Sequence, residues 1–415
     1  MKSPIPFFDT LDLLRDSEFQ QQQLSRLKAI ALPEAEGDFK QAWEFLISYR
    51  GSEATFNAYR RELERLLHWS WFIAQKSLKE LRRLDFETFI EFCQKPPKNW
   101  IGTKNVSRFI NHMGTRIPNP QWRPFVASIS KKAYSEGQTP NINHYSLSQS
   151  AIQSIFSILS SFYNYLIQEE YTDVNPVALI RQKSKFLRKK QTQMVVRRLS
   201  EVQWRYVIET TEQMAMTDPT KHERSLFIMN ALYGMYLRIS ELASSERWQP
   251  QMGHFHCDAH GNWWFQTVGK GNKERMVSVS DAMMNALKRY RKTLGLSPTP
   301  PPADKTPLIP KIQGSGAITS TREIRHIVQI CFDEAICRLK NAGLDEEAES
   351  LMSATVHWLR HTGISDDVKH RPREHVRDDA GHGSSAITDK YIDIELRERH
   401  ASARDKKINP HDKQS

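Results

Sequence analysis

Six residues in the second half of the chain have side chains that could together break and re-form a phosphodiester bond. A tyrosine hydroxyl can attack phosphorus, and arginine can stabilise the negative charge of the pentacovalent transition state. Lysine and histidine can carry protons to and from the leaving and attacking oxygens. Because guanidinium groups supply the positive charge, the set requires no metal ion and no cofactor. The residues are Arg238, Lys270, His357, Arg360, His382 and Tyr391.

Arg238 and Lys270 lie in motifs that could present a cation to a phosphate. Arg238 stands in YLRISEL, where Ser240 could cap a following helix whose N-terminus would also attract an anion. Lys270 stands in VGKGNKERMV, at the predicted tip of a β-hairpin that could reach a DNA groove. There an ammonium could protonate a leaving alkoxide, and Lys273 is the alternative for this role. Taken alone, each cation is more simply explained as a surface residue.

The remaining residues come from two motifs nearer the C-terminus. His357 and Arg360 lie in HWLRHTG, where a spacing of three places both on one face of a helix. His382 and Tyr391 lie in AGHGSSAITDKYI, where Ser384 or Ser385 could cap a helix that carries the tyrosine. Without the other motifs, the tyrosine would be interpreted as an aromatic side chain packed on the core.

The elements that must position these residues are predicted to be mainly α-helical. Apolar residues recur at helical spacing in several stretches, and alternation predicts three antiparallel strands in the second half of the chain. The stretch 96–145 is predicted to hold loops and short helices. Helices are expected at 52–67, 148–168, 199–214, 223–233 and 321–340, and another helix is expected to begin near 281. Strands are expected at 253–257, 263–268 and 275–280.

Composition favours a polyanionic partner and divides the chain. Lysine and arginine number 59 against 48 acidic residues, a net charge of +11, and phosphate binding releases condensed counterions. The stretch 181–198 holds eight basic and no acidic residues, which indicates a linker that also follows a phosphate backbone, or else a solvated run of charge. We expect an N-terminal extension, a helical DNA-binding domain, this linker, a domain with the six residues and a polar tail. Their ranges are 1–37, 38–180, 181–198, 199–395 and 396–415.

The chain shows no sign of an oxidising or membrane environment. Its four cysteines form no CxxC pair, no apolar run is long enough to cross a bilayer, and the N-terminus does not resemble a signal peptide. We therefore expect a cytoplasmic protein in the nucleoid that has no membrane contact.

Read in order, RISEL, GKGNKER, HWLRHTG and AGHGSSAITDKYI resemble the conserved boxes of the tyrosine recombinases, the lambda-integrase family. The resemblance covers roughly 200–395, and 39–180 more loosely resembles the helical core-binding domain of that family. It implies a two-domain clamp on double-stranded DNA in which Tyr391 forms a 3′-phosphotyrosyl link. It further implies that Arg238 and Arg360 hold the phosphate. Lys270 would protonate the 5′-hydroxyl, His357 assist proton transfer and His382 hydrogen-bond the phosphate.

The resemblance also implies that the protein forms a homo-tetramer on DNA and is the integrase of a mobile element. Whether accessory proteins take part is left open. Three departures from the family pattern leave open how the helix before His382 packs. Ala380 stands where the family has a bulkier apolar residue, the stretch 366–377 is unusually charged, and Trp358 lies inside the His-x-x-Arg box.

Three alternatives remain at this stage. A type IB topoisomerase would use the same phosphotyrosine chemistry, as a monomer and without a defined site. A DNA-binding protein without catalysis would need the charge but not the ordered set. The segment HFHCDAH at 254–260 could bind a metal ion, although it falls on the predicted sheet.

Overall fold

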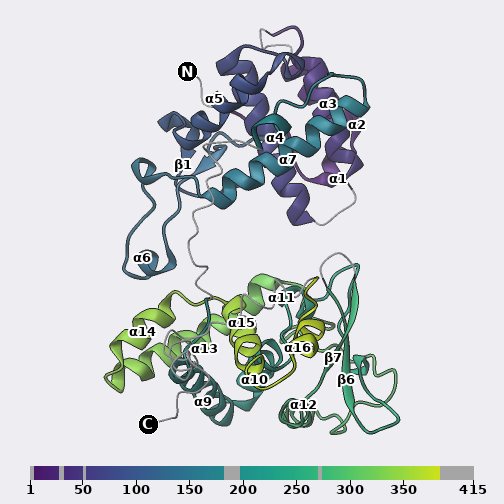
Figure 1. Ribbon diagram of the computed structural model, residues 1–415, viewed down its shortest axis with the longest axis vertical. Coiled ribbons are helices and arrows are strands. Elements are labelled where there is room, and N and C mark those ends of the chain that lie inside the picture. Colours follow the sequence, from purple (N-terminus) through teal and green to yellow (C-terminus); the bar gives the residue numbers. More distant parts are fainter. Residues whose placement is uncertain (1–3, 28–31, 50–52, 182–196, 270–272, 384–415) are drawn as a thin grey trace, which may run out of the picture. The chain divides into compact units, whose positions relative to one another are not determined.

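The computed structural model describes residues 4–27, 32–49, 53–181, 197–269 and 273–383. Lys270, Tyr391 and both serines of GSS lie outside these residues, as does most of the linker. The chain forms two compact units, Met1–Thr192 and Gln193–Ser415, shown in Figure 1. None of the described helices combines the length and the apolar character needed to cross a membrane.

The first unit is a helical domain built around α4 and α7. Both helices are amphipathic, and α4 packs against α3 and α7 with an aromatic core between them. Ser148 caps α7 by accepting a hydrogen bond from the Ala151 N–H at 3.2 Å. The helices are α1 (Leu11–Leu14), α2 (Ser17–Leu27), α3 (Ala35–Ser48), α4 (Glu53–Trp69), α5 (Arg83–Gln94), α6 (Lys131–Ser135), α7 (Gln149–Gln168) and α8 (Ala178–Arg181), with η1 (Ser70–Ala74), η2 (Leu78–Glu80), η3 (Lys98–Trp100) and η4 (Ile142–His144).

The N-terminal segment is part of this core, where the sequence suggested a separate extension. Phe7 and Phe8 are buried, and their N–H groups donate to the Glu64 carboxylate at 2.6 and 3.2 Å. Burying these rings stabilises the segment, since each buried aromatic contributes on the order of 2 kcal/mol. No sequence pattern indicated this docking, because its polar partners, the Glu64 carboxylate and the His68 ring, are single side chains on α4.

The stretch 96–145 contains strands as well as short helices, so the prediction of loops and short helices alone is wrong. Strands β2 (Phe109–His112) and β3 (Thr115–Pro118) form an antiparallel hairpin, and β1 (Ile101–Gly102) pairs with β4 (Phe125–Val126) in parallel. The hairpin turns at Met113 and Gly114, whose φ values of 48° and 79° match a two-residue turn with both φ positive. Methionine is an unusual residue for the first of these positions, and the turn was therefore missed.

The second unit is mainly helical with one three-stranded sheet, which confirms the expected fold class. Its sheet has the antiparallel order β5-β6-β7, and α10 packs against α9, α12, α13 and α15. Its elements are α9 (Glu201–Thr217), α10 (Pro219–Gly234), α11 (Ile239–Leu242), η6 (Met252–His254), β5 (Phe255–Cys257), β6 (Trp263–Val268), β7 (Glu274–Ser278), α12 (Asp281–Thr293), α13 (Thr321–Asn341), α14 (Asp345–Met352), α15 (Val356–Asp367) and α16 (Arg373–Ala380).

Two contacts bring α15 and α16 against this core. Gly363 lets α15 approach α10 closely, because a Cβ there would clash with the Tyr233 carbonyl oxygen. Helix α16 packs on β7 and α15, and Val376 and Ala380 on its inner face join Tyr236 and Ile364 in a small apolar cluster. The small side chain of Ala380 therefore fits a tight position at the end of α16.

Candidate active site

Arg238 lies at the start of α11, after a backbone turn at Tyr236. The φ of Tyr236 is +51°, a left-handed conformation that a residue with a side chain adopts at a cost of about 1 kcal/mol or more. Arg238 itself is the N-cap residue of α11, so the prediction that Ser240 caps this helix is wrong. Its N–H donates to the Glu241 carboxylate at 2.8 Å, and its side chain is 27% exposed.

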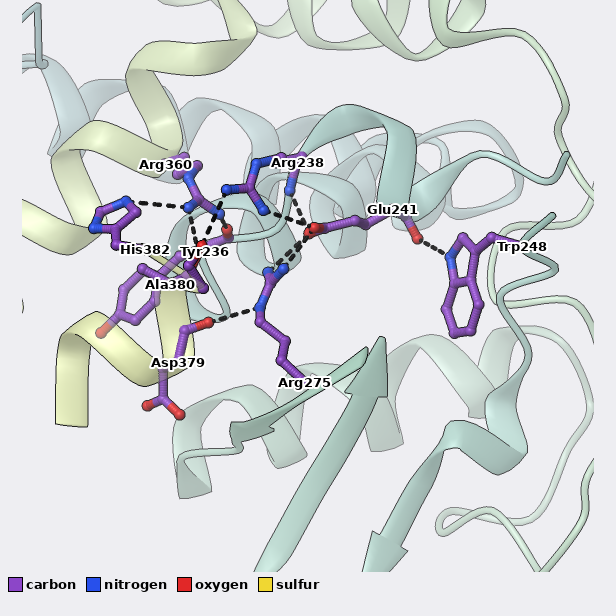
Figure 2. Close-up of polar contacts among 10 residues, drawn as sticks. Tyr236, Arg238, Glu241, Trp248, Arg275, Arg360, Asp379, Ala380 and His382 are labelled. Atoms are coloured by element: carbon purple, nitrogen blue, oxygen red, sulfur yellow. Dashed lines mark hydrogen bonds and ion pairs between the residues drawn. The ribbon is translucent and has the colours of Figure 1, made fainter. Parts of the chain in front are cut away.

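Glu241 forms the electrostatic centre of the site, as Figure 2 shows. Its buried carboxylate accepts two hydrogen bonds from Arg275, at 2.6 and 2.8 Å, and one from Arg238 Nη1 at 3.0 Å. Burial by itself would raise the pKa of Glu241, but the hydrogen bonds and charges of the two arginines outweigh it and lower the pKa. Glu241 is therefore an anion that fixes two guanidinium groups.

Three arginines bind three successive carbonyl groups at the C-terminal end of α16. Arg275 Nε donates to the Asp379 oxygen at 2.9 Å, Arg360 Nη2 to the Ala380 oxygen at 2.5 Å, and Arg238 Nη2 to the Gly381 oxygen at 3.4 Å. The last carbonyls of a helix have no partner within it and carry partial negative charge, so cations are stabilised there. Figure 2 shows the three arginines with Asp379 and Ala380.

Gly381 is required at this helix end for two reasons. Its φ of +63° lies in the left-handed region, and a Cβ on it would meet Arg275 Cδ at 2.8 Å. The chain then turns so that the His382 N–H donates to the Arg377 oxygen at 3.1 Å. The glycine of the AGH sequence thus permits both the turn and the approach of Arg275.

Arg360 is buried, with only 2% of its surface exposed. Its Nη1 donates to the carbonyl oxygen of Tyr236, and its Nη2 lies 3.4 Å from His382 Nε2. The left-handed turn at Tyr236 thus directs a carbonyl toward the guanidinium of Arg360. Sequence reasoning paired this arginine with the phosphate, whereas the described residues surround it with backbone acceptors.

The three histidines near these arginines favour their neutral forms. Burial and the nearby Arg360 and Arg238 lower the pKa of His382 to about 4, and burial with His357 lowers the pKa of His361 to about 4 as well. The pKa of His357 is also lowered, by desolvation and the same two arginines, although its side chain is exposed. His357 and His361 lie edge to face with ring centroids 4.3 Å apart. At neutral pH these rings can exchange protons with a substrate but add little charge.

A pocket of about 360 Å³ adjoins the site on the side of His357. Four of its lining residues are apolar, and His357 is among the polar ones. The lining residues are Leu232, Leu237, Ile239, Arg325, Thr355, Val356 and His357.

The base of the predicted lysine hairpin lies beside Arg238. Gly269, the last residue described on the β6 side, is so close that a Cβ on it would meet Arg238 Nη1 at 3.3 Å and Glu241 Oε1 at 3.2 Å. Its N–H donates to the Lys273 carbonyl oxygen at 2.8 Å, which closes the end of the β6–β7 pair. Lys273 is exposed there, whereas Lys270 lies outside the described residues.

In the histidine-rich segment HFHCDAH, the side chains of His254 and Asp258 have structural roles. His254 accepts the Gln251 N–H at 2.9 Å and stacks on Trp248 with ring centroids 4.6 Å apart. Asp258 closes the following turn by accepting from the Asn262 and His260 N–H groups at 2.9 and 2.8 Å. Among the described residues, no group of three or more potential ligands is arranged to hold a metal ion.

A comparison with curated proteins finds similarity to a tyrosine recombinase. A tyrosine recombinase XerC of Pediococcus pentosaceus is 29% identical over 149 residues, which are 35% of this chain and 43% of the relative. About a third of this chain is thus similar to part of a tyrosine recombinase. The match spans less than half the length of that relative. No protein-family model matches the chain.

The fold of a solved site-specific recombinase matches nearly the whole chain. The XerH site-specific recombinase, in a post-cleavage complex with a palindromic difH substrate, gives a TM-score of 0.50 at 13% identity and covers 97% of this chain and 99% of its own. A lambda integrase dimer bound to a COC′ core site gives a TM-score of 0.48 at 12% identity, over 87% of this chain and 96% of its own.

Sequence reasoning missed two residues of this site, Glu241 and Arg275. Both stand inside quoted motifs, Glu241 in RISEL and Arg275 in GKGNKER. Arg275 also lies two residues before the buried Val277, which places both on the inner face of β7. An inward-facing arginine on a strand requires a buried anion, so this alternation was the available signal.

Proposed function

We propose that the protein cleaves and rejoins double-stranded DNA through a covalent phosphotyrosine intermediate. One observation carries the proposal. Arg238 and Arg360, 122 residues apart in sequence, meet His382 at the C-terminal end of α16, in the chain order that the tyrosine recombinases share. Two guanidinium groups beside a neutral imidazole are suited to a phosphate that gains negative charge as it is attacked.

In this proposal, Tyr391 is the nucleophile. Its hydroxyl oxygen attacks the phosphorus and the bond from phosphorus to the 5′-oxygen breaks, so that a 3′-phosphotyrosyl ester forms. Lys270 supplies the proton to the 5′-oxygen, with Lys273 as the alternative donor. Attack of a 5′-hydroxyl on the ester reverses the step and returns the proton. Since one phosphoester replaces another, rejoining needs no nucleotide cofactor.

The arginines and histidines have distinct parts in this reaction. Arg238 is partly exposed and binds a phosphate oxygen while Glu241 fixes its orientation. Arg360 stabilises the same charge and exchanges one carbonyl contact for phosphate when DNA is bound. His382, neutral and accepting from Arg360 on Nε2, carries its proton on Nδ1 and donates it to a phosphate oxygen. His357 assists transfer of the tyrosine proton.

The test is the formation of a covalent adduct. Labelled suicide duplexes, nicked so that the cleaved 5′ fragment diffuses away, are offered as a pool of varied sequence and resolved on denaturing gels. Wild type forms an adduct that maps to Tyr391, and Tyr391→Phe forms none. Tyr290→Phe is the matched control, because the buried Tyr290 hydroxyl has no hydrogen-bond partner among the described residues. DNA binding without an adduct would refute the proposal, and relaxation of supercoiled plasmid without strand exchange would indicate a topoisomerase.

The first unit supplies a basic surface for the same DNA. Residues 92–135 include eight lysines and arginines and no acidic residue. Arg108 and Arg116 are neutralised by Glu64 and Asp9. The exposed cations Lys95, Lys98 and Lys104 then remain to face an anionic partner. We include this surface, with 38–180, in the DNA-binding domain, and 199–395 forms the catalytic domain.

The proposal also covers the assembly that the protein forms on DNA and the biological reaction that it carries out. Exchange between two duplexes needs four cleavages, which four copies of one active site supply, so a homo-tetramer on DNA is expected. We further propose that the protein integrates a mobile element. Recombination between two unlike sites cloned on one plasmid, read by sequencing the junctions, supports integration, whereas recombination only between identical sites supports resolution.

A further inference from the structure

Beneath the arginine cluster lies a second polar network centred on Arg371. Arg371 lies in the turn between α15 and α16, and its side chain is 31% exposed. Its Nη2 donates to Asp379 Oδ2 at 2.6 Å and to Ser278 Oγ at 2.9 Å, and its Nη1 donates to the Tyr236 hydroxyl at 2.9 Å. One guanidinium thus contacts three segments that are far apart in the sequence.

Each of these partners belongs to a segment that carries part of the proposed active site. Tyr236 stands two residues before Arg238 and provides the carbonyl that Arg360 binds. Ser278 ends β7, the strand that carries Arg275. Asp379 provides the first of the three carbonyls bound by arginines and stands three residues before His382.

The network is buried and well partnered around Asp379. Asp379 is 6% exposed, and its carboxylate accepts from the Ser278 N–H at 3.0 Å, from the Ser278 hydroxyl and from Arg371. A buried carboxylate that loses its paired cation becomes strongly unfavourable, because desolvation is no longer offset. The position of Asp379 therefore depends on Arg371, and so do the carbonyl groups that follow it.

We propose that Arg371 is a positioning residue for strand cleavage, which holds His382 and the carbonyls at 379–381 in register with Arg238 by bridging Asp379 to Tyr236 and Ser278. This inference rests on the proposed function. Arg371 has no part in the chemistry. It acts by fixing the end of α16, from which Arg360 and His382 take their positions.

The experiment compares Arg371→Met with Arg373→Met in the full-length chain. Both changes remove one guanidinium from neighbouring residues, but Arg373 is exposed on α16 and lies outside the network. We expect Arg371→Met to slow single-turnover adduct formation at saturating DNA by about tenfold or more, with a DNA Kd within about twofold of wild type. Arg371→Lys, which keeps the charge but not the planar fork, recovers part of the rate.

A second readout is independent of activity. The pKa of the His382 imidazole, followed by NMR, should rise in Arg371→Met from about 4 toward its usual value near 6.5, because the ring becomes more hydrated and moves away from the arginines. Asp379→Asn, which preserves the side-chain shape, should shift the ring in the same direction. If wild type forms no adduct, the proposed function fails, and the His382 titration still decides the role of Arg371.

Two results would overturn the inference. One is that Arg371→Met has the same His382 titration and the same cleavage rate as wild type and Arg373→Met. The other is a cleavage rate that falls only in proportion to the folded fraction measured by circular dichroism, which would make Arg371 a structural residue alone.

Discussion

Arg238 and Arg360 have the same side chain in different surroundings, and this difference separates their expected effects. Arg238 is 27% exposed and shares Glu241 with Arg275, so Glu241 keeps a cation when Arg238 is removed. Arg360 is 2% exposed and contacts the buried carbonyls of Tyr236 and Ala380. Loss of the first affects mainly the reaction, whereas loss of the second affects the fold as well.

Arg238→Ala should reduce adduct formation by at least about 100-fold, the usual loss when one preorganised donor to a developing charge is removed. The free energy of unfolding should stay within about 0.5 kcal/mol of wild type. Single-turnover cleavage and urea denaturation measure the two quantities. Arg205→Ala, on the exposed face of α9, is the control. Equal losses of DNA binding and cleavage would contradict the assigned role of Arg238.

Arg360→Ala should lower the free energy of unfolding by about 2–4 kcal/mol, because two buried carbonyl oxygens lose their donor. Adduct formation should be lost too. Urea denaturation of Arg360→Ala beside Arg238→Ala makes the comparison direct. Similar stability in the two variants would show that water replaces the guanidinium at no cost.

The lowered pKa of His382 makes the stability of the folded chain depend on pH. The pKa of His382 is about 4 in the folded chain and about 6.5 when unfolded, so the unfolded chain binds the extra proton between these values. Its contribution to stability is complete above pH 6.5 and is lost as pH falls toward 4. His382→Asn should therefore reduce the dependence on pH in this window, measured as the urea midpoint from pH 7 to 4. His375→Asn, an exposed change on α16, is the matched control.

Among the elements, the C-terminal end of α16 is the one on which the site depends most. Gly381→Ala should destabilise the chain more than Gly343→Ala, measured by thermal unfolding. Both glycines have positive φ, so each substitution costs about 1–2 kcal/mol in backbone strain. Only Gly381 has a neighbour in the way, Arg275 Cδ at 2.8 Å, whereas a Cβ on Gly343 meets nothing within 4 Å. Equal destabilisation of the two variants would show that the Arg275 side chain moves aside at no cost in free energy.

The sequence predicts elements well wherever one face is buried in a regular pattern. Trp263–Val268 is a strand as expected, because Phe265 and Thr267 alternate with partly exposed neighbours. The cap of α11 and the Met113–Gly114 turn were missed, because in each the backbone rather than a preferred residue type determines the conformation. The gathering of Arg238, Arg360 and His382 follows from the ordered motifs. Their carbonyl partners do not, since every residue offers the same carbonyl.

Over the whole molecule, charge predicts a salt-dependent affinity for DNA. Lys98→Gln combined with Lys104→Gln should weaken DNA binding and reduce the slope of log Kd against log salt by about 0.9 for each phosphate that is no longer neutralised. Adduct formation at saturating DNA should be unchanged, because both lysines belong to the first unit. Fluorescence anisotropy from 50 to 300 mM salt, roughly the useful range, gives the slope. Lys288→Gln plus Lys292→Gln on α12 serves as a control of equal charge. A slope equal to wild type would remove this surface from the DNA interface.

The three arginines that bind the main chain at 379–381 have a consequence for how this protein's lineage can change. A residue of any type offers a backbone carbonyl, so this part of the site tolerates substitution at exposed neighbouring positions such as Asp378. Only the glycine that permits the left-handed bend is held to one residue type. Distant homologues can therefore share this arrangement while their amino-acid sequences differ. A search by helix-end geometry should find homologues that a sequence search misses.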